Sequence, residues 1–243
     1  MFALYKREVR SYFCTPFAYI VSALFLMVFS WSFIRSISQM SSSTLSFQFP
    51  AVFYNNFFFF IFLIPLLTMR TFAEERKSHT ETLWLSAPIR VWQVVLAKYL
   101  AVVTVFGLML VLSLFYPLVA FIKGSVIVSS LICGYLGFIL WSLVCIAVGM
   151  LCSAVTDSPI LAAVFGEAAM IFVIILDSFA ETQFVQSLPW LSSAMLWFST
   201  QHRFAAFAQG FFSVSDLVFF VSLSAVVLAW IVIVIEKRRW SRG

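Results

Sequence analysis

Six long stretches of apolar residues constrain the fold of this 243-residue chain more than any other feature. A helix rises about 1.5 Å per residue, so about 20 apolar residues cross the hydrocarbon layer of a bilayer. A segment in lipid must satisfy its own backbone amides and carbonyls, and open-edged β-structure cannot do so, which leaves helices. The sequence therefore predicts an all-α membrane protein with about six transmembrane helices. The expected spans are residues 17–34, 51–69, 91–122, 126–152, 160–176 and 217–235.

The composition excludes an ordinary soluble domain. Apolar residues make up 63% of the chain and charged residues only 10%, whereas a globular domain is about half apolar and about a quarter charged. A core of this size cannot bury so much apolar surface, so the remainder must face lipid. Glycine and proline are scattered along the chain, which leaves no flexible linker between separate parts. We therefore expect one membrane domain over residues 1–243.

The lysines and arginines are distributed unevenly between the two ends of the expected spans. Twelve of the fifteen lie in the N-terminal arm, within residues 70–98 or in the C-terminal tail. Connections rich in these residues stay in the cytoplasm, and an even number of spans then places both termini on that side. The basic clusters flank apolar segments, as expected for orientation and for contact with anionic lipids. This placement argues against nucleic-acid binding.

The N-terminal arm has the pattern of an amphipathic helix that lies in the membrane interface. At about 100° per residue, Tyr5 and Tyr12 fall on one face with apolar neighbours, while Arg7 and Arg10 point away from it. Such a helix rests its apolar face on membrane lipids. We expect it over residues 1–16, and the alternative is a frayed basic end that only orients the first span.

Residues 70–90, between the second and third spans, are dense in charge where most of the chain is not. The second helix is expected to extend into this connection. Ser78 or Thr80 is a suitable cap for a new short helix, which must end before Pro88. That helix would present Glu81 beside apolar side chains, a combination suited to docking on a soluble partner. The alternative is a solvated loop that only fixes orientation.

Residues 177–215 form a long connection on the opposite side of the membrane. The segment is rich in aromatic residues, and Pro189 and Gly210 break it. Long loops without structure are uncommon in compact domains. We therefore expect short helices that lie on the outer leaflet or partly re-enter it. His202 lies there without a Ser or Cys nucleophile pattern, so a polar cap suits it better than catalysis.

Glu167 lies midway along the fifth expected span. An ionisable side chain at that depth costs a few kcal/mol and should face protein or water. The small residues Ala162, Ala163 and Gly166 lie close by and allow another helix to approach. Two interpretations stay open: part of a substrate path or subunit contact, or a protonated acid bonded to a neighbouring helix.

The chain carries none of the common motifs of an enzyme or a channel. It contains no GxxxxGK[ST] phosphate-binding loop, no HExxH and no GxSxG. Its four cysteines lack metal-ligand spacing, and nothing resembles a selectivity filter. We therefore expect neither catalysis nor a bound cofactor or metal. The pattern favours half of a transporter that another subunit drives.

Three parts of the sequence resemble the permease subunits of type 2 ABC transporters. Residues 65–88, PLLTMRTFAEERKSHTETLWLSAP, are similar to the family's cytoplasmic loop, in effect LTMRxFAEE followed by GTxExL and a proline. Residues 7–20 resemble the entry to the family's first span, and residues 201–216 with 236–240 resemble its C-terminal end. The closest resemblance is to the gliding-motility-associated branch, with the permeases of nitrous-oxide-reductase maturation as neighbours. The match departs at His79, where the family usually has glycine.

The resemblance implies a site and a mechanism. Residues 78–85 correspond to a coupling helix seated in a groove of a separate ATPase subunit, and residues 2–13 correspond to an interfacial connecting helix. ATP-driven closure of two ATPase subunits would move the transmembrane halves between inward-facing and outward-facing states. The expected coupling residues are Glu74, Glu75, Arg76, Lys77, Ser78, His79, Thr80, Glu81, Thr82 and Leu83.

The resemblance also implies an assembly. The expected partner is a cytoplasmic ABC ATPase dimer, which would bind ATP and Mg²⁺ while this chain binds no cofactor. Six spans are half of the family's usual twelve, so a second permease subunit, identical or different, is expected. The expected location is the bacterial inner membrane, and the expected activity is export of an unidentified substrate. The alternative function is a membrane scaffold or assembly factor without transport.

Overall fold

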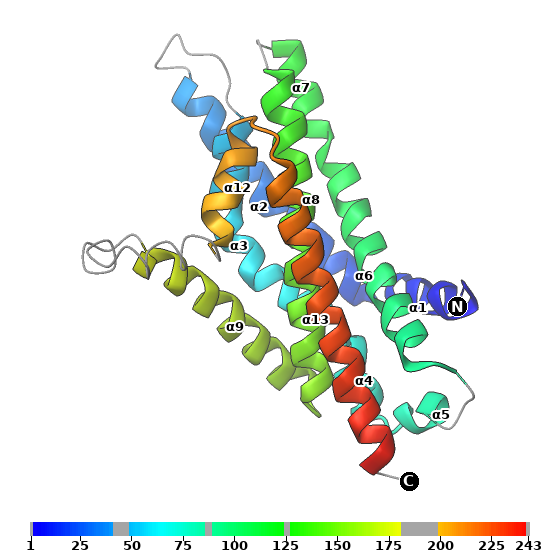
Figure 1. The fold of residues 1–243 in the computed structure, drawn as a ribbon. Coiled ribbons are helices and arrows are strands. Elements are labelled where there is room, and N and C mark those ends of the chain that lie inside the picture. The colour runs from blue at the N-terminus through cyan, green and yellow to red at the C-terminus, as the bar shows by residue number, and fades with distance from the viewer. Residues whose placement is uncertain (1, 41–48, 86–88, 124–126, 181–198, 242–243) are drawn as a thin grey trace.

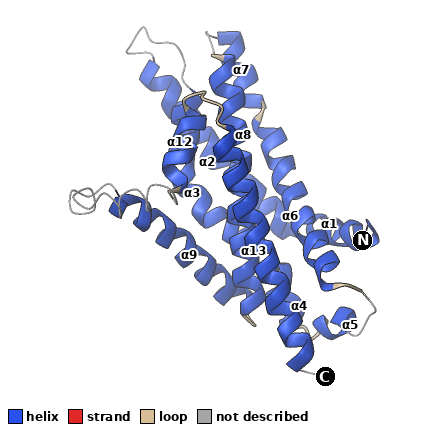
Figure 2. Cartoon of the chain, in the orientation of Figure 1, coloured by secondary structure: helices blue, strands red, loops and turns tan. Residues whose placement is uncertain are grey.

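The computed structural model describes residues 2–40, 49–85, 89–123, 127–180 and 199–241. Within these ranges every regular element is a helix (Figure 2). The helices, in chain order, are α1 (Phe2–Cys14), α2 (Pro16–Met40), α3 (Phe49–Thr68), α4 (Arg70–Lys77), α5 (Glu81–Leu85), α6 (Val91–Ser113), α7 (Phe115–Lys123), α8 (Val128–Val155), α9 (Pro159–Ala180), α12 (Thr200–Ala208) and α13 (Val214–Ser241).

Five segments of the described residues are helical, long and apolar enough to cross a membrane. They are Pro16–Ser38, Val91–Ile122, Val128–Val155, Pro159–Leu176 and Val214–Arg239. The prediction of an all-helical class is confirmed for the described residues, and five of the six expected spans match one of these five segments. The other expected span, residues 51–69, lies almost entirely in α3, which packs against α2, α8 and α9. Its passage through the membrane stays a prediction.

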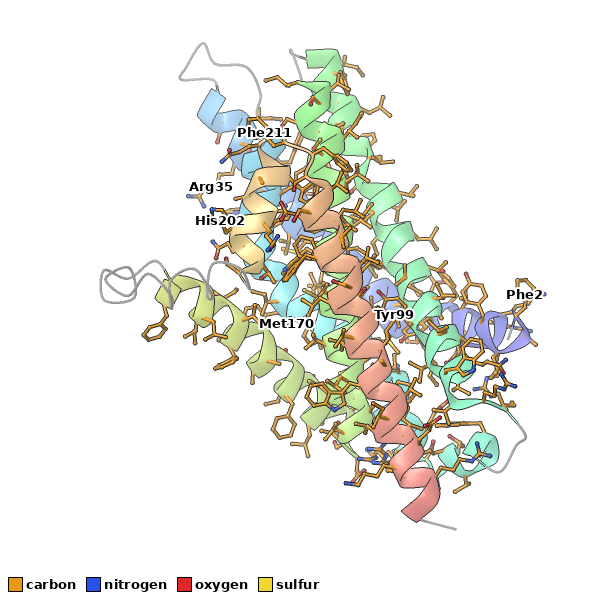
Figure 3. All side chains as sticks on the ribbon, viewed as in Figure 1. Phe2, Arg35, Tyr99, Met170, His202 and Phe211 are labelled. Carbon is orange, nitrogen blue, oxygen red and sulfur yellow. The ribbon has the colours of Figure 1, made fainter. Side chains whose placement is uncertain are left out.

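The long helices form a bundle from which two elements depart (Figure 1). Helix α1 runs across the bundle rather than along it, and α9 leans away from the other long helices. We call the end of the bundle that holds α4, α5 and the C-terminus of α13 the basal end. Basic side chains gather near this end, whereas Arg35 and His202 lie toward the opposite end (Figure 3).

Phenylalanine rings fill the centre of the bundle. Phe25, Phe60, Phe106 and Phe138, from α2, α3, α6 and α8, are each at most 4% exposed. The ring of Phe60 meets those of Phe25 and Phe138 edge to face, with centroids 5.1 and 4.4 Å apart. Lipid contains no water, so the hydrophobic effect does not drive helices together there. They associate through close packing and polar contacts instead. Edge-to-face ring pairs supply such packing, and this cluster joins four helices.

A glycine lets α8 approach α3 closely. A Cβ atom added at Gly149 would collide with the side chain of Thr68, the last residue of α3. The Thr68 hydroxyl donates to the carbonyl oxygens of Ile64 and Pro65, so it cannot move away without losing these bonds. The small residue therefore fixes how near the two helices lie at the point where the chain enters α4.

Helices α6 and α7 follow each other almost without a break. Leu114, which separates them, has helical dihedral angles of −62° and −13°. Pro117 has no backbone N–H to donate to the Ser113 carbonyl, and the Tyr135 hydroxyl, from α8, donates to that carbonyl at 3.3 Å. The apolar segment therefore continues as one Val91–Ile122 unit of 32 residues.

Candidate functional site

The coupling residues expected from the sequence lie on α4, on α5 and on the turn between them. Met69, between α3 and α4, has helical dihedral angles, so α4 continues the direction of α3 as expected. Ser78 does not cap α5: its hydroxyl donates back to the carbonyl oxygens of Glu74 and Glu75, at 2.9 and 3.2 Å. The Thr80 hydroxyl also donates to the Glu75 carbonyl. Both hydroxyls add a second donor to carbonyls at the end of α4 that already accept backbone amides, because the chain turns there before α5 begins.

His79 makes this turn with a left-handed backbone. Its φ angle is +56°, and among the described residues it is the one non-glycine with positive φ. The amide of Thr80 donates to the Glu75 carbonyl and that of His79 to the Arg76 carbonyl, at 2.9 and 3.0 Å. This pair of bonds is a Schellman motif, which normally places glycine at the left-handed position. The imidazole of His79 is exposed.

Arg76 is buried rather than exposed, with 7% of its surface accessible. Its Nε donates to Glu81 Oε2 at 3.2 Å, at the start of α5. Its Nη1 donates to the Thr156 carbonyl at 2.6 Å and to Asp157 Oδ1 at 3.1 Å. Its Nη2 donates to the Ala154 carbonyl at 2.7 Å. One guanidinium therefore joins α4 to α5, to the end of α8 and to the turn before α9. We call these contacts the Arg76 clamp.

Lys98 of α6 is a second buried cation at the basal end. Its ammonium lies 2.9 Å from Glu75 Oε1 and 3.3 Å from Glu8 Oε2, and its side chain is 3% exposed. It also donates to the Thr71 carbonyl at 2.8 Å and lies 5.3 Å from the centroid of the Phe72 ring. The lysine thus connects α6 to α4 and to α1, and we call these contacts the Lys98 cluster.

Glu75 connects the Lys98 cluster to α5. Its Oε2 accepts a hydrogen bond from Trp84 Nε1 at 3.0 Å, and its Oε1 lies 3.4 Å from Arg7 Nη2 as well as near Lys98. The Trp84 side chain is buried. Two neighbouring residues of α4 therefore connect α5 to different parts of the bundle. Arg76 connects it to α8 and the turn before α9, and Glu75 connects it to α6 and α1.

Helix α1 packs one side on the bundle. The Tyr5 hydroxyl lies 2.8 Å from Thr104 Oγ1, and the Tyr12 hydroxyl donates to the Leu67 carbonyl at 3.3 Å. Burial raises the pKa of the Tyr12 phenol, so this group stays protonated and can donate. The two tyrosines thus contact protein, although we expected their face to rest on lipid. Arg10 is exposed, as expected for the polar face.

The surface of the loop is polar. The exposed residues of the expected coupling set are Lys77, Ser78, His79, Thr80 and Thr82. The side chain of Leu83 lies outside the described residues. Beside them, between α1 and α5, is a groove of about 480 Å³. The residues that line it are Leu4, Arg7, Glu8, Ser11, Glu75, Thr80, Trp84 and Ile89.

The far end of the bundle has an ion pair of its own. Arg203 of α12 pairs with Asp216 of α13, and its guanidinium lies 4.2 Å from the centroid of the Phe219 ring. His202 is exposed, and its backbone amide donates to Ser199, the residue that caps α12. Helix α12 lies within the expected connection 177–215. Residues 181–198 of that connection lie outside the described part of the chain.

Glu167 is partly exposed on α9 and has no hydrogen-bond or ion-pair partner among the described residues. The preceding Gly166 packs against Pro65 of α3, so α9 meets the bundle beside the acid. Among the described residues, no group of three His, Cys, Asp or Glu side chains could hold a metal ion.

The sequence reasoning missed Glu8 and Asp157 as parts of the site. Both are acidic residues that pair with cations far away in the chain, Lys98 and Arg76. A signal was present for Asp157, because it is the lone acid in the short connection between the fourth and fifth expected spans. The rule of alternating sides places that connection on the same side as residues 70–90.

Comparison with known proteins adds one finding. The family model described as ABC-2 family transporter protein matches residues 34–236. The match covers most of the chain and includes α4, α5 and the turn before α9. No curated protein matches the chain at a significant level.

Proposed function

Because the chain belongs to the ABC-2 family of transporter proteins, we propose that it is the permease subunit of an ABC transporter that exports its substrate. In this proposal ATP and Mg²⁺ bind to a separate ATPase dimer, since the sequence has no phosphate-binding loop. The ATPase docks on the exposed surface formed by Lys77, Ser78, His79, Thr80 and Thr82. The groove between α1 and α5 extends this docking surface.

One observation carries the proposal. The loop between α3 and α6 has a polar exposed surface, while two buried cations attach its inner side to the rest of the chain. Lys98 pairs with Glu75 and Glu8, which joins the loop to α6 and α1. Arg76 donates hydrogen bonds to carbonyls at the end of α8 and pairs with the exposed Asp157 in the turn before α9. A loop that served only to orient the chain would need no such attachment. A rigid loop fastened to the long helices suits a partner that pushes on the surface and moves the bundle.

The proposed topology follows from the charges. We place the basal end in the cytoplasm, because Lys and Arg concentrate there and cytoplasmic connections carry these residues. Helix α3 is then the sixth span, and both termini lie in the cytoplasm of a bacterial inner membrane. A test is a single cysteine at Ser78→Cys in a cysteine-free background. A reagent that cannot cross membranes should label it in inverted vesicles and not in intact cells, and the opposite result refutes this topology.

A second permease subunit completes the proposed transporter. The window of α9 that could span a membrane is only 22% buried within the chain, and Glu167 on this helix has no described partner. Both features support a neighbouring subunit, identical or different, or a substrate path beside α9. A cross-link between cysteines introduced at position 164 of two chains would identify an identical copy, and its absence in an active complex would favour a different subunit.

The docking proposal is tested by co-expressing the chain with the separately encoded ABC ATPase subunits of its source organism. We expect the two proteins to copurify and the permease to raise the ATPase rate. Lys77→Glu should weaken copurification at least tenfold. Lys237→Glu is the matched control, because it makes the same charge reversal at an exposed residue of α13 at the basal end. Equal binding by both variants would place the docking surface elsewhere.

The alternative of a membrane scaffold predicts a different result in the same experiment. A scaffold would bind its partners without any nucleotide-dependent change in its own structure and without raising the ATPase rate. Stimulation of the ATPase rate by the wild-type chain therefore decides between the two functions.

A further inference from the structure

Arg76 differs from its neighbours in the loop. Lys77, Ser78 and His79 are exposed, but the Arg76 side chain is 7% exposed and points inward. It is therefore poorly placed to contact a docked protein, even though it lies within the segment that resembles the family's coupling region. Its role must be sought among the elements that it touches inside the chain.

The geometry of the Arg76 clamp requires a guanidinium. Three nitrogens of one planar group reach four acceptors on three segments: Glu81 on α5, the carbonyls of Ala154 and Thr156, and Asp157. Arginine presents five N–H donors in a fixed fork, whereas lysine has a single nitrogen on a flexible chain. A lysine at this position could keep the charge but could not hold all three segments at once.

The clamp is also electrostatically matched to the end of α8. The last carbonyls of a helix carry partial negative charge and lack partners within the helix. Arg76 donates to two carbonyls there, at residues 154 and 156. Glu81, which is 5% exposed, supplies a full negative charge from α5. The guanidinium is thus held between α5 and the α8–α9 turn, and moving either one away would take acceptors from a buried charge.

We propose that Arg76 is a positioning residue that makes α5 and the turn between α8 and α9 move as one unit. A push on the exposed loop then reaches α8 and α9 through the side chain of Arg76, in addition to reaching α3 through the backbone of α4. This inference rests on the proposed function, because it concerns how docking of an ATPase moves the membrane helices.

The first test compares Arg76→Gln with Arg70→Gln in the complex with the ATPase. Arg70 is also on α4 and loses an ion pair, but its partners are Glu74 on α4 and the Phe17 ring on α2, not α8 or α9. Arg76→Gln should still copurify with the ATPase but lose at least tenfold of the stimulation, and Arg76→Lys should lose part of it. Arg70→Gln should behave as wild type. Full stimulation of Arg76→Gln, or loss of docking instead of stimulation, would overturn the inference.

The second test needs no ATPase and separates the inference from the proposed function. Spin labels at Thr82→Cys and Ile160→Cys, both exposed positions, report the distance from α5 to the start of α9. Wild type should give a narrow distribution. Glu81→Gln should broaden it, because this change removes the ion pair that holds α5 to Arg76 and leaves the contacts of Arg76 with α8 in place, so the chain can still fold. An unchanged distribution would refute the clamp even if the chain proves to be a permease. Failure of the wild-type chain to bind the ATPase, with a broadened distribution in Glu81→Gln, would refute the function and keep the clamp.

Discussion

Replacement of Lys98 by methionine should destabilise the chain strongly, because it leaves two glutamates without their buried cation. Methionine keeps the length and the apolar stem of lysine. The ammonium lies 2.9 Å from Glu75 and 3.3 Å from Glu8, whose side chains are 20% and 13% exposed. At an effective dielectric constant of about 20, each contact is worth about 5 kcal/mol before desolvation is subtracted.

The net cost of Lys98→Met follows from this geometry. Breaking a buried ion pair by removing one partner costs about 3–5 kcal/mol, since the other charge stays buried. Arg7 also contacts both glutamates, but its side chain is 58% exposed, so water screens its attraction. We therefore expect a loss of about 3–5 kcal/mol in the free energy of unfolding, or a melting temperature lower by about 10 °C.

The assay is thermal unfolding of the detergent-solubilised protein, followed by tryptophan fluorescence. Lys237→Met is the control, because Lys237 is exposed on α13 and its loss should change the unfolding free energy by less than about 0.5 kcal/mol. Adding Glu8→Gln and Glu75→Gln to Lys98→Met should restore much of the stability by removing the unpaired charges. An unchanged melt for Lys98→Met, or no recovery in the triple variant, would refute the assignment of Lys98 as the charge that holds α1, α4 and α6 together.

Three further predictions use the same unfolding assay. His79→Gly should stabilise the chain by about 1 kcal/mol, because glycine adopts positive φ without the steric cost of a side chain; a loss of stability would contradict the strained turn. Gly149→Ala should destabilise the chain by about 1–3 kcal/mol through its collision with Thr68. The same change should cost less in a Thr68→Ala variant, and an equal cost with and without Thr68 would exclude the collision as the cause. Arg203→Met should cost about 3 kcal/mol by leaving Asp216, whose side chain is 13% exposed, without its partner. Arg203→Lys should cost less because it keeps the charge, and similar losses in the two variants would show that the charge is not the cause.

The sequence predicted the long helices well because lipid leaves few alternatives to a helix. The ends of the helices were predicted less accurately, since hydropathy marks only the part of a helix that lies in lipid. Helix α2 continues to Met40, beyond the expected end at residue 34, and α13 continues to Ser241, beyond residue 235. Polar and charged residues can prolong a helix in water or among headgroups, where their side chains carry no apolar signal.

The site shows a sharper division between local and distant features. The turn after α4 could be predicted from the sequence, because a residue pattern that usually has glycine there indicates a special backbone conformation. The inward direction of the Arg76 side chain could not be predicted from the sequence, because its acceptors at residues 154–157 lie about 80 positions away in the chain. A charged loop in a single sequence looks solvated. Only the packing of α4 against α8 shows which of its charges are enclosed.

The same division applies to α1. Its amphipathic pattern correctly separated Arg10 from the tyrosines, but the pattern does not tell whether the apolar side meets lipid or protein. Tyr5 and Tyr12 meet hydroxyl and carbonyl groups of α6 and α3, so these two residues attach α1 to the bundle. Phe2 and Phe13, which are 77% and 37% exposed, are the aromatic residues of α1 that can enter the membrane interface.

The combined length of α6 and α7 has a consequence for the surrounding bilayer. Thirty-two helical residues extend about 48 Å at 1.5 Å per residue, whereas the hydrocarbon layer is about 30 Å thick. A tilt of about 50° would be needed to contain this length, and helices in membranes tilt by about 40° at most. The segment must therefore extend beyond the hydrocarbon layer. It can do so at the start of α6, where Lys98 pairs with charged residues of α4 and α1, or at the α7 end. Phe115, Leu118 and Ile122 are exposed and apolar at the α7 end, so a thick bilayer would cover more of this surface than lipids with short acyl chains.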